Sequence, residues 1–210
     1  THIHSRSANA KWLTEIAHRN PIWIHTKDAE RLGVNNEDLL KITTAIGWFV
    51  DKVWVTEAIK PGVVACSHHI GRWRRQNDEG NRFMTNTVNI KNLGDGKWKM
   101  ETVSGVEPWK TDDPDTNRVW WRDGGVHQNI THPTNPDPIS GAHCWLQEVS
   151  ISKPEPEEKY GDIFVDTNKS FEHFKKWNEW AKARETHPNG LRRPLWMARP
   201  LHPQIENYYL

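Results

Sequence analysis

A run of polar side chains near the start of the chain, His4-Ser5-Arg6-Ser7, combines a guanidinium with two hydroxyls, and Trp12 follows closely. Guanidinium and hydroxyl donors placed together bind phosphate oxygens through charge-assisted hydrogen bonds. The run therefore predicts contact with an anionic group. The alternative interpretation is a solvated polar terminus.

A second polar cluster covers residues 66–73 and contains His68, His69, Gly71 and Arg72. It directly follows a predicted strand, where loops commonly carry function. Adjacent histidines point to opposite sides of an extended backbone, so His68 and His69 make a poor chelating pair for zinc. Hydrogen bonding to a ligand, with Arg72 facing an anion, fits these residues better. The alternative is a structural turn with exposed histidines.

A third cluster covers residues 124–131 and contains Asn129 after a pair of glycines. A carboxamide offers a donor beside an acceptor, which suits the edge of a flat heterocycle. A glycine-rich turn with capping residues is the alternative.

Short strands and one short helix must position these clusters. Pro21 separates the first helical turns from an expected strand over residues 22–24. Thr26 is the expected N-cap of a helix through Leu32, and Gly33 is its expected left-handed terminator. The sequence then predicts strands over residues 39–43, 48–56, 63–67 and 145–152, with turns at residues 45–47 and 61–62.

The remaining segments are less regular. Residues 76–123 are interpreted as an insertion that holds a hairpin around residues 94–96. Ser170 is the expected N-cap of a helix to about Arg184, with an apolar stripe expected to dock on the rest of the fold or on a neighbour. The proline-rich tail from Pro188 is expected to be extended.

Composition bounds the partners of the chain. Its 210 residues carry a net charge of +1, so neither nucleic acid nor an anionic membrane is favoured, and no segment has the length of a membrane span. The two cysteines, Cys66 and Cys144, exclude a disulfide framework or a four-cysteine cluster within this chain. Most of the thirteen tryptophans are expected in the core, with Trp12, Trp73 and Trp145 as exceptions.

The segment 20–64 joins a proline-bounded strand, a D-A-x-x-L-G helix cap, a second strand, a glycine turn and V-T-x-x-I-x-P-G-V. This order resembles the C-terminal molybdopterin-dinucleotide-binding domain of the molybdopterin oxidoreductases, the dimethyl-sulfoxide-reductase family. The resemblance covers residues 1–71 and 124–153. Residues 137–147 also resemble the closing D-P-x-x-G motif of the family. The chain departs from the pattern at Glu37, where a glycine is common.

The resemblance implies a mainly β fold, a double-psi β-barrel with an inserted hairpin region and a C-terminal helix. It implies a domain over residues 1–153, with residues 154–210 as helix and extended tail. It also implies a cofactor site without catalytic residues or metal ligands of its own. The implied cofactor-binding residues are His4, Ser5, Arg6, Ser7, Trp12, Ser67, His68, His69, Arg72, Asn129, His143 and Gln147.

The implied function is that of a cofactor-binding C-terminal domain or subunit of a molybdenum or tungsten oxidoreductase. The implied cofactor is bis(molybdopterin guanine dinucleotide), shared with further domains that supply the metal ligand. Because the chain begins at Thr1 within a polar motif, we expect it to be cut from something larger. The expected partners are those domains or subunits, together with an iron–sulfur protein, in the cytoplasm or periplasm of a prokaryote.

Two other classes of function stay open at this point. A carbohydrate-binding or cell-wall module would show flat exposed tryptophans in a row. A protein-interaction barrel would show a groove without a cluster of polar loops.

Overall fold

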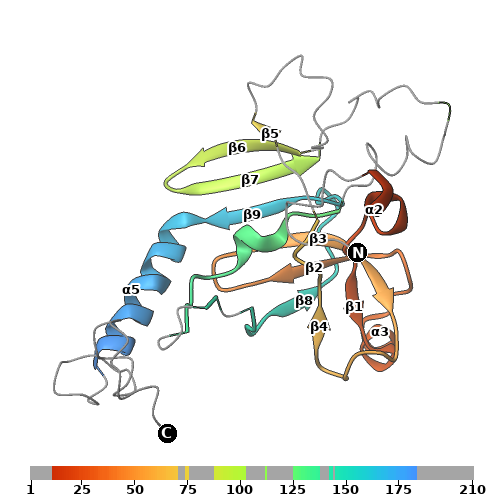
Figure 1. Cartoon of the computed structure of the whole chain (residues 1–210), viewed down its shortest axis with the longest axis horizontal. Coiled ribbons are helices and arrows are strands. Elements are labelled where there is room, and N and C mark those ends of the chain that lie inside the picture. Colours follow the sequence, from red (N-terminus) through yellow and green to blue (C-terminus); the bar gives the residue numbers. More distant parts are fainter. Residues whose placement is uncertain are drawn as a thin grey trace, which may run out of the picture.

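The computed structural model describes residues 11–70, 74–75, 88–102, 112, 125–137, 142–143 and 145–183. Over these residues the chain is mainly β, as expected. The described strands form an open sheet in the order β4-β1-β3-β9-β7-β6-β5, with β2 paired to β3 and β8 paired to β2 (Figure 1). The strands are β1 (Ile22–Ile24), β2 (Leu39–Thr43), β3 (Gly47–Val55), β4 (Val64–Ala65), β5 (Arg74–Arg75), β6 (Val88–Gly94), β7 (Lys97–Thr102), β8 (Ser150–Ser152) and β9 (Ile163–Asp166).

The long strand β3 organises the sheet. One of its edges pairs over residues 48–52 with antiparallel β2, which confirms the expected hairpin. The other edge is shared, because its first residues pair with antiparallel β9 and its last residues pair with parallel β1. Residues 49–53 are buried or partly buried on both faces of the strand, so their exposure does not alternate from one residue to the next. Gly47 lies where β9 approaches most closely, and a Cβ added there would be 2.1 Å from the carbonyl oxygen of Phe164.

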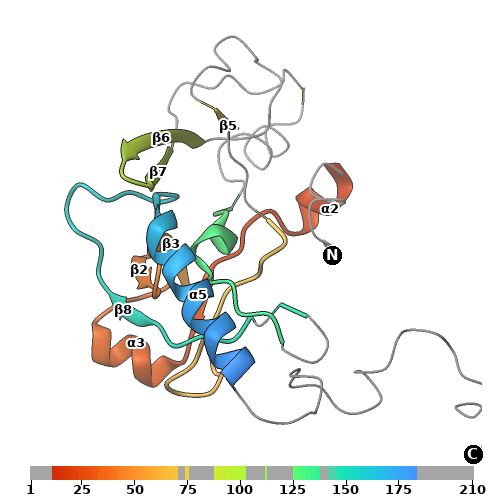
Figure 2. The ribbon, with the colours of Figure 1, turned by 90° about the vertical axis from the view of Figure 1, so that its left-hand side faces the viewer.

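The expected hairpin around residues 94–96 is present as β6 and β7. Its turn uses three successive residues with positive φ, Gly94, Asp95 and Gly96. Strand β7 also pairs with β9, so the hairpin continues the main sheet. The hairpin and helix α3 (Thr26–Leu32) lie at opposite ends of the molecule (Figure 2).

Helix α3 has the expected bounds and the expected terminator, since Gly33 adopts φ 61° and ψ 49°. Its N-cap is His25 and not Thr26, because the His25 side chain accepts the backbone N–H of Lys27. Glu37, at the position where the resembled pattern has glycine, adopts φ 71°. Its carboxylate accepts from the Arg19 guanidinium at 2.6 Å, a contact that lowers the pKa of Glu37.

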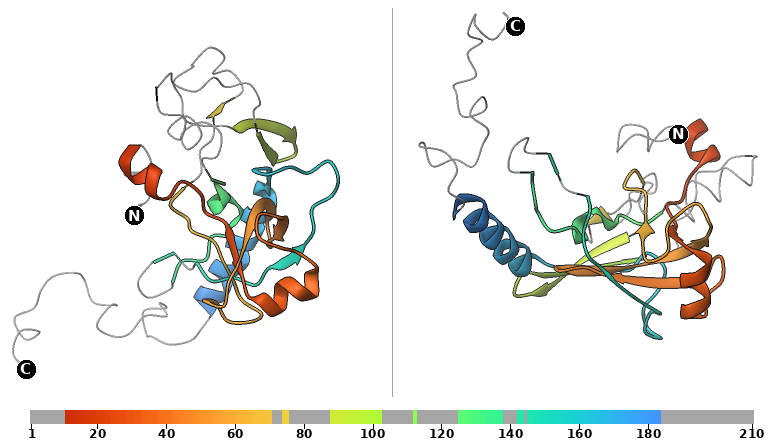
Figure 3. Two further views of the ribbon diagram at one scale, coloured as in Figure 1. Left: turned by 90° about the vertical axis from the view of Figure 1, so that its right-hand side faces the viewer. Right: turned by 90° about the horizontal axis from the view of Figure 1, so that it is seen from below.

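The C-terminal helix is present as α5 (Thr167–Ala183) but begins earlier than expected. Asp166, and not Ser170, caps it, because its Oδ1 accepts the backbone N–H groups of Asn168 and Lys169. The helix extends away from the sheet, at the opposite end of the molecule from α2 (Lys11–Ile16) (Figure 3). Part of its apolar stripe is exposed, since Phe171 is 67% accessible.

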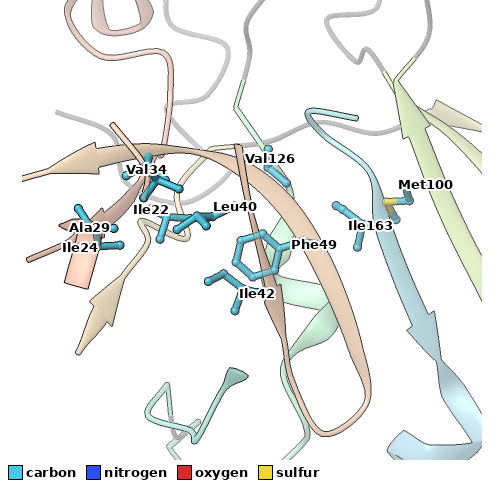
Figure 4. Packing of buried hydrophobic residues seen from close by; sticks show 11 residues of the cluster. Ile22, Ile24, Ala29, Val34, Leu40, Ile42, Phe49, Met100, Val126 and Ile163 are labelled. Carbon is cyan, nitrogen blue, oxygen red and sulfur yellow. The ribbon is translucent and has the colours of Figure 1, made fainter. Parts of the chain in front are cut away.

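Aliphatic residues fill the core, together with Phe49 and Met100 (Figure 4). Ile163 of β9 and Met100 of β7 face each other as a cross-strand pair. The prediction of a tryptophan-rich core was wrong for the part of the chain that is described, where no tryptophan is fully buried. Trp23 and Trp54 meet edge to face on neighbouring strands and leave Trp54 partly in solvent.

Two predicted strands are shorter than expected. The strand expected over residues 63–67 is the two-residue β4, and the one expected over 145–152 is β8 alone. Leu146, an expected apolar member of that strand, is 86% exposed. No described helix has the length and apolarity needed to cross a membrane.

Candidate functional site

A cavity of about 460 Å³ opens beside β4 and the segment that leads into β8. Most of its wall is aliphatic or aromatic, with Ile22, Ile42 and Phe49 among the core residues that reach it. Its polar wall is contributed by residues far apart in the sequence, including Gln128, His132, Trp145 and Gln147. A mostly apolar cavity with a few polar groups is the usual form of a small-molecule site.

Ring side chains gather around Trp145, which is partly exposed. The His68 ring stacks on the Trp145 ring, with centroids 4.6 Å apart and planes 25° apart. The His143 ring meets the Trp145 ring edge to face at 4.5 Å, and the His132 ring lies 5.7 Å from it. Residues expected to contact the cofactor, His68 and His143, thus share one aromatic neighbour.

His68 and His69 do not point to opposite sides, which corrects the expectation from an extended backbone. The chain bends at these residues, so their rings lie side by side with centroids 4.1 Å apart. The hydroxyl oxygen of Ser67 lies 2.8 Å from Nδ1 of His69 and holds that ring. No group of three or more potential metal ligands occurs among the described residues.

Two amides bring unpaired acceptors to this region. The Asn129 side chain, on the 3-10 helix η1 (Gln128–Thr131), donates from Nδ2 to the carbonyl oxygen of His68 at 3.1 Å. Its Oδ1 is buried without a hydrogen-bond partner among the described residues, and the same holds for Oε1 of Gln147. Leaving such an acceptor unpaired costs about 1–3 kcal/mol, so the site favours a ligand that supplies N–H donors.

A buried amide network lies behind these residues. Asn20 donates from Nδ2 to the carbonyl oxygens of Ser67 and Val126, both at 2.8 Å, and its Oδ1 accepts the N–H of Val126. Gln128 donates to the same Ser67 carbonyl at 2.8 Å. Sequence reasoning missed Asn20, Gln128 and His132. The partners of Asn20 lie 47 and 106 residues away, and no local pattern signals such contacts.

Burial sets the protonation of two groups near the cavity. Burial, and then the nearby His143, hold the pKa of His132 below its usual value, so its ring is neutral near pH 7. Burial, and then the Asp51 carboxylate, raise the pKa of Cys66 well above its usual value. The Cys66 thiol donates to the carbonyl oxygen of Asn20 at 2.9 Å and is not in a disulfide. Both groups are therefore uncharged partners for a ligand.

The structure brings together six of the residues expected at the site. Ser67, His68, His69, Asn129, His143 and Gln147 are joined through the contacts above or through the wall of the cavity. Trp12 lies in α2, is 75% exposed and does not line the cavity. His4, Ser5, Arg6, Ser7 and Arg72 lie outside the described residues.

The described residues suit a flat, nitrogen-rich heterocycle. The stacked rings offer planar surfaces, and the unpaired oxygens of Asn129 and Gln147 accept N–H groups. The described residues that line the cavity include no arginine or lysine.

Comparisons with known proteins agree with this chemistry. Residues 1–95 match the family model described as the molydopterin dinucleotide binding domain. The chain is 33% identical over 78 residues to a protein of Halobacterium salinarum named as a putative catalytic subunit of dimethyl sulfoxide reductase. That match covers 37% of this chain and 9% of the relative.

A second relative is the molybdopterin-containing subunit of the arsenate respiratory reductase from Chrysiogenes arsenatis. It is 34% identical over 68 residues, which are 29% of this chain and 8% of that subunit. The matched region thus spans less than a tenth of the length of either relative.

Proposed function

We propose, from the match of residues 1–95 to the molydopterin dinucleotide binding domain, that the chain holds bis(molybdopterin guanine dinucleotide) in a molybdenum or tungsten oxidoreductase. It acts as the cofactor-binding C-terminal part of that enzyme. When bound, the cofactor supplies a dithiolene-held metal that cycles by two electrons. Other domains or subunits supply the metal ligand, and an iron–sulfur protein exchanges the electrons.

One observation carries this proposal. Three segments that are far apart in the sequence meet at one cavity. Gln147 lines the cavity and Asn129 directly follows the lining residue Gln128, and the side-chain oxygen of each is buried without a partner among the described residues. The aminopyrimidinone edge common to pterin and guanine carries N–H donors, so it satisfies both acceptors. His132 lies in the same wall, and its lowered pKa keeps the ring neutral, so it does not repel the N–H groups of the heterocycle.

The roles of the remaining residues follow from their chemistry. Arg6 and Arg72 bind the anionic groups of the dinucleotide, with Ser5 and Ser7 as further donors. His68 and His143, together with Trp145, present ring faces and edges to the heterocycle. The chain's own groups therefore bind and orient the cofactor and exclude water from it, while the redox chemistry belongs to the cofactor.

We also propose that these contacts lie within residues 1–153, with residues 76–123 as an insertion, and that the sheet completes a double-psi barrel in the intact enzyme. The parallel pairing of β1 with β3 in an otherwise largely antiparallel sheet supports that topology. Beyond residue 153, β9 and α5 support the domain. The edge-to-face contact of Trp23 with Trp54 provides no flat platform for a sugar.

Gln147→Leu tests the function directly. It removes an amide whose Oε1 is unpaired, so the chain without cofactor keeps its stability or gains about 1 kcal/mol. Loss of the hydrogen bond to the ligand weakens binding of molybdopterin guanine dinucleotide about tenfold. Titration calorimetry and chemical denaturation of the same samples measure both effects.

Asn35→Leu is the matched control, because it makes a similar change at an exposed turn that does not line the cavity. It should leave affinity unchanged. In the intact enzyme, Arg6→Ala should lower the cofactor content measured by metal analysis. Wild-type affinity in Gln147→Leu would exclude Gln147 from the site, and absence of dinucleotide binding by the wild-type chain would refute the proposed function.

A further inference from the structure

Asn20 connects the two loops that carry His68 and Asn129. It is only 1% exposed and directly precedes Pro21 and β1, which pairs with β3 and β4 in the sheet. Neither the family match nor the sequence motifs give this residue a role.

The Asn20 amide is fully used. Its Nδ2 donates to the carbonyls of Ser67 and Val126 at 2.8 Å, and Oε1 of Gln128 lies 3.2 Å away. Its Oδ1 accepts the N–H of Val126 at 2.8 Å, and its backbone oxygen accepts the thiol of Cys66. A carboxamide offers two N–H hydrogens together with an acceptor oxygen, whereas an ionised carboxylate only accepts, so aspartate cannot reproduce these contacts.

Two of the loop residues that contact the Asn20 side chain directly precede a proposed ligand-binding residue. Ser67 precedes His68, and Gln128 precedes Asn129. The two loops then bond to each other directly through Asn129 Nδ2 and the His68 carbonyl. A shift of Asn20 therefore moves both sides of that contact.

The glycine at position 125 shows how closely the loops approach Asn20. Gly125 has φ 78°, and a Cβ there would lie 2.5 Å from Oδ1 of Asn20 and 2.6 Å from Cγ2 of Ile70. Only glycine lets the second loop pass at this distance. By contrast, a Cβ added at Gly62 or Gly94 would have no neighbour within 4 Å.

We propose that Asn20 is a positioning residue for cofactor binding, which sets the His68 loop against the Asn129 loop without touching the ligand. The inference rests on the proposed function of the site. It predicts that a change at Asn20 acts on affinity through Asn129, and that it loosens the two loops while the sheet stays intact.

The test uses the full chain with Asn20→Asp, Asn129→Leu and the double variant, titrated with molybdopterin guanine dinucleotide. Asn20→Asp keeps the acceptor for Val126 and removes both amide hydrogens, so affinity should fall about tenfold or more. In the Asn129→Leu background the same change should cost less than about threefold, because residues that act together are not additive. Equal losses in both backgrounds, or wild-type affinity in Asn20→Asp, would overturn the proposal.

Hydrogen exchange supplies a readout that does not need the ligand. Residues 64–70 and 125–132 should exchange about tenfold faster in Asn20→Asp, with residues 47–55 of β3 unchanged. Faster exchange spread equally over the sheet would show a structural role only. If the wild-type chain fails to bind the dinucleotide, the proposed function is wrong, and the exchange pattern alone decides whether Asn20 positions the loops.

Two further variants serve as a stability control and as an alternative to Asn20→Asp. Ile163→Val removes a methylene from the core away from the cavity and should lower stability without changing affinity. If Asn20→Asp does not fold, Gln128→Met keeps Asn20 and removes the second donor to Ser67, and the same non-additivity with Asn129→Leu is expected.

Discussion

At the scale of single residues, the site is defined by groups that the folded chain leaves partly unsatisfied. Most buried polar groups in proteins are hydrogen-bonded, and Asn20 and Gln128 obey that rule. Asn129 and Gln147 each keep one buried oxygen without a described partner, and both line or adjoin the same region. An unpaired buried acceptor destabilises the free chain, and a ligand that donates a hydrogen bond to it removes that cost. This is the property expected of a binding residue.

His132 makes stability depend on pH at this scale. Its pKa is lowered in the folded chain by burial and by His143, whereas in the unfolded chain it lies near 6.5. Below the pKa of the unfolded chain, the unfolded chain binds the proton more readily than the folded chain, so stability falls as the pH falls below about 6.5. Denaturant titrations at a series of pH values should show that the free energy of unfolding depends less on pH in His132→Gln than in the wild-type chain. An unchanged pH dependence would mean that other groups control it.

At the scale of elements, turns and caps decide where strands and helices end. Glycines with positive φ terminate α3 and form the β6–β7 turn, at positions where other residues pay a conformational cost. Caps are less predictable, because His25 and Asp166 perform the role expected of Thr26 and Ser170. A cap depends on which side chain reaches the free N–H groups, and several polar residues near each helix start compete for that role.

The contact of β3 with β9 gives a prediction for Gly47. Gly47→Ala would place a methyl group 2.1 Å from the backbone oxygen of Phe164, so the two strands must separate. We expect a loss of about 3 kcal/mol in the free energy of unfolding, measured by chemical denaturation.

Gly62→Ala provides the comparison for that variant. Gly62 has φ 77° and no neighbour within 4 Å of the added Cβ, so only the backbone penalty of about 1 kcal/mol applies. Equal losses in the two variants would show that the approach of β9 to β3 is looser than described.

At the scale of the whole molecule, the sheet joins segments from both halves of the chain. Strand β9 lies between β3 and β7, and Ile163 and Val165 are buried in the core. The region matched by the family model ends at residue 95, so the matched segment alone lacks β9 and all of β7. The binding region and its support therefore depend on each other for stability.

Truncation tests that dependence. A fragment of residues 1–183 contains every described strand and should unfold cooperatively with nearly the stability of the full chain. A fragment of residues 1–153 lacks β9, exposes the paired edges of β3 and β7, and should lose cooperative unfolding. Circular dichroism with thermal denaturation compares the two fragments. A cooperative 1–153 fragment would show that β9 is dispensable.

The sequence by itself determined the features that depend on near neighbours. Strand β2, the bounds of α3, its Gly33 terminator and the turn at residues 94–96 were predicted because hydrophobic periodicity and glycine act over a few residues. It also predicted that several polar loops meet, and His68, Asn129, His143 and Gln147 lie around Trp145 and the cavity.

Only the tertiary structure decided which of these groups meet and what holds them. The local sequence does not specify the backbone bend that places the His68 ring beside the His69 ring. It also does not specify the contacts of Asn20 or the position of β9 in the sheet, because both depend on segments far apart in the chain. The burial of tryptophans was mispredicted for the same reason, since it depends on whether another segment covers their side of the sheet. Contacts across a hundred residues are selected by the packing of the whole chain, and their energies appear only when the chain is folded.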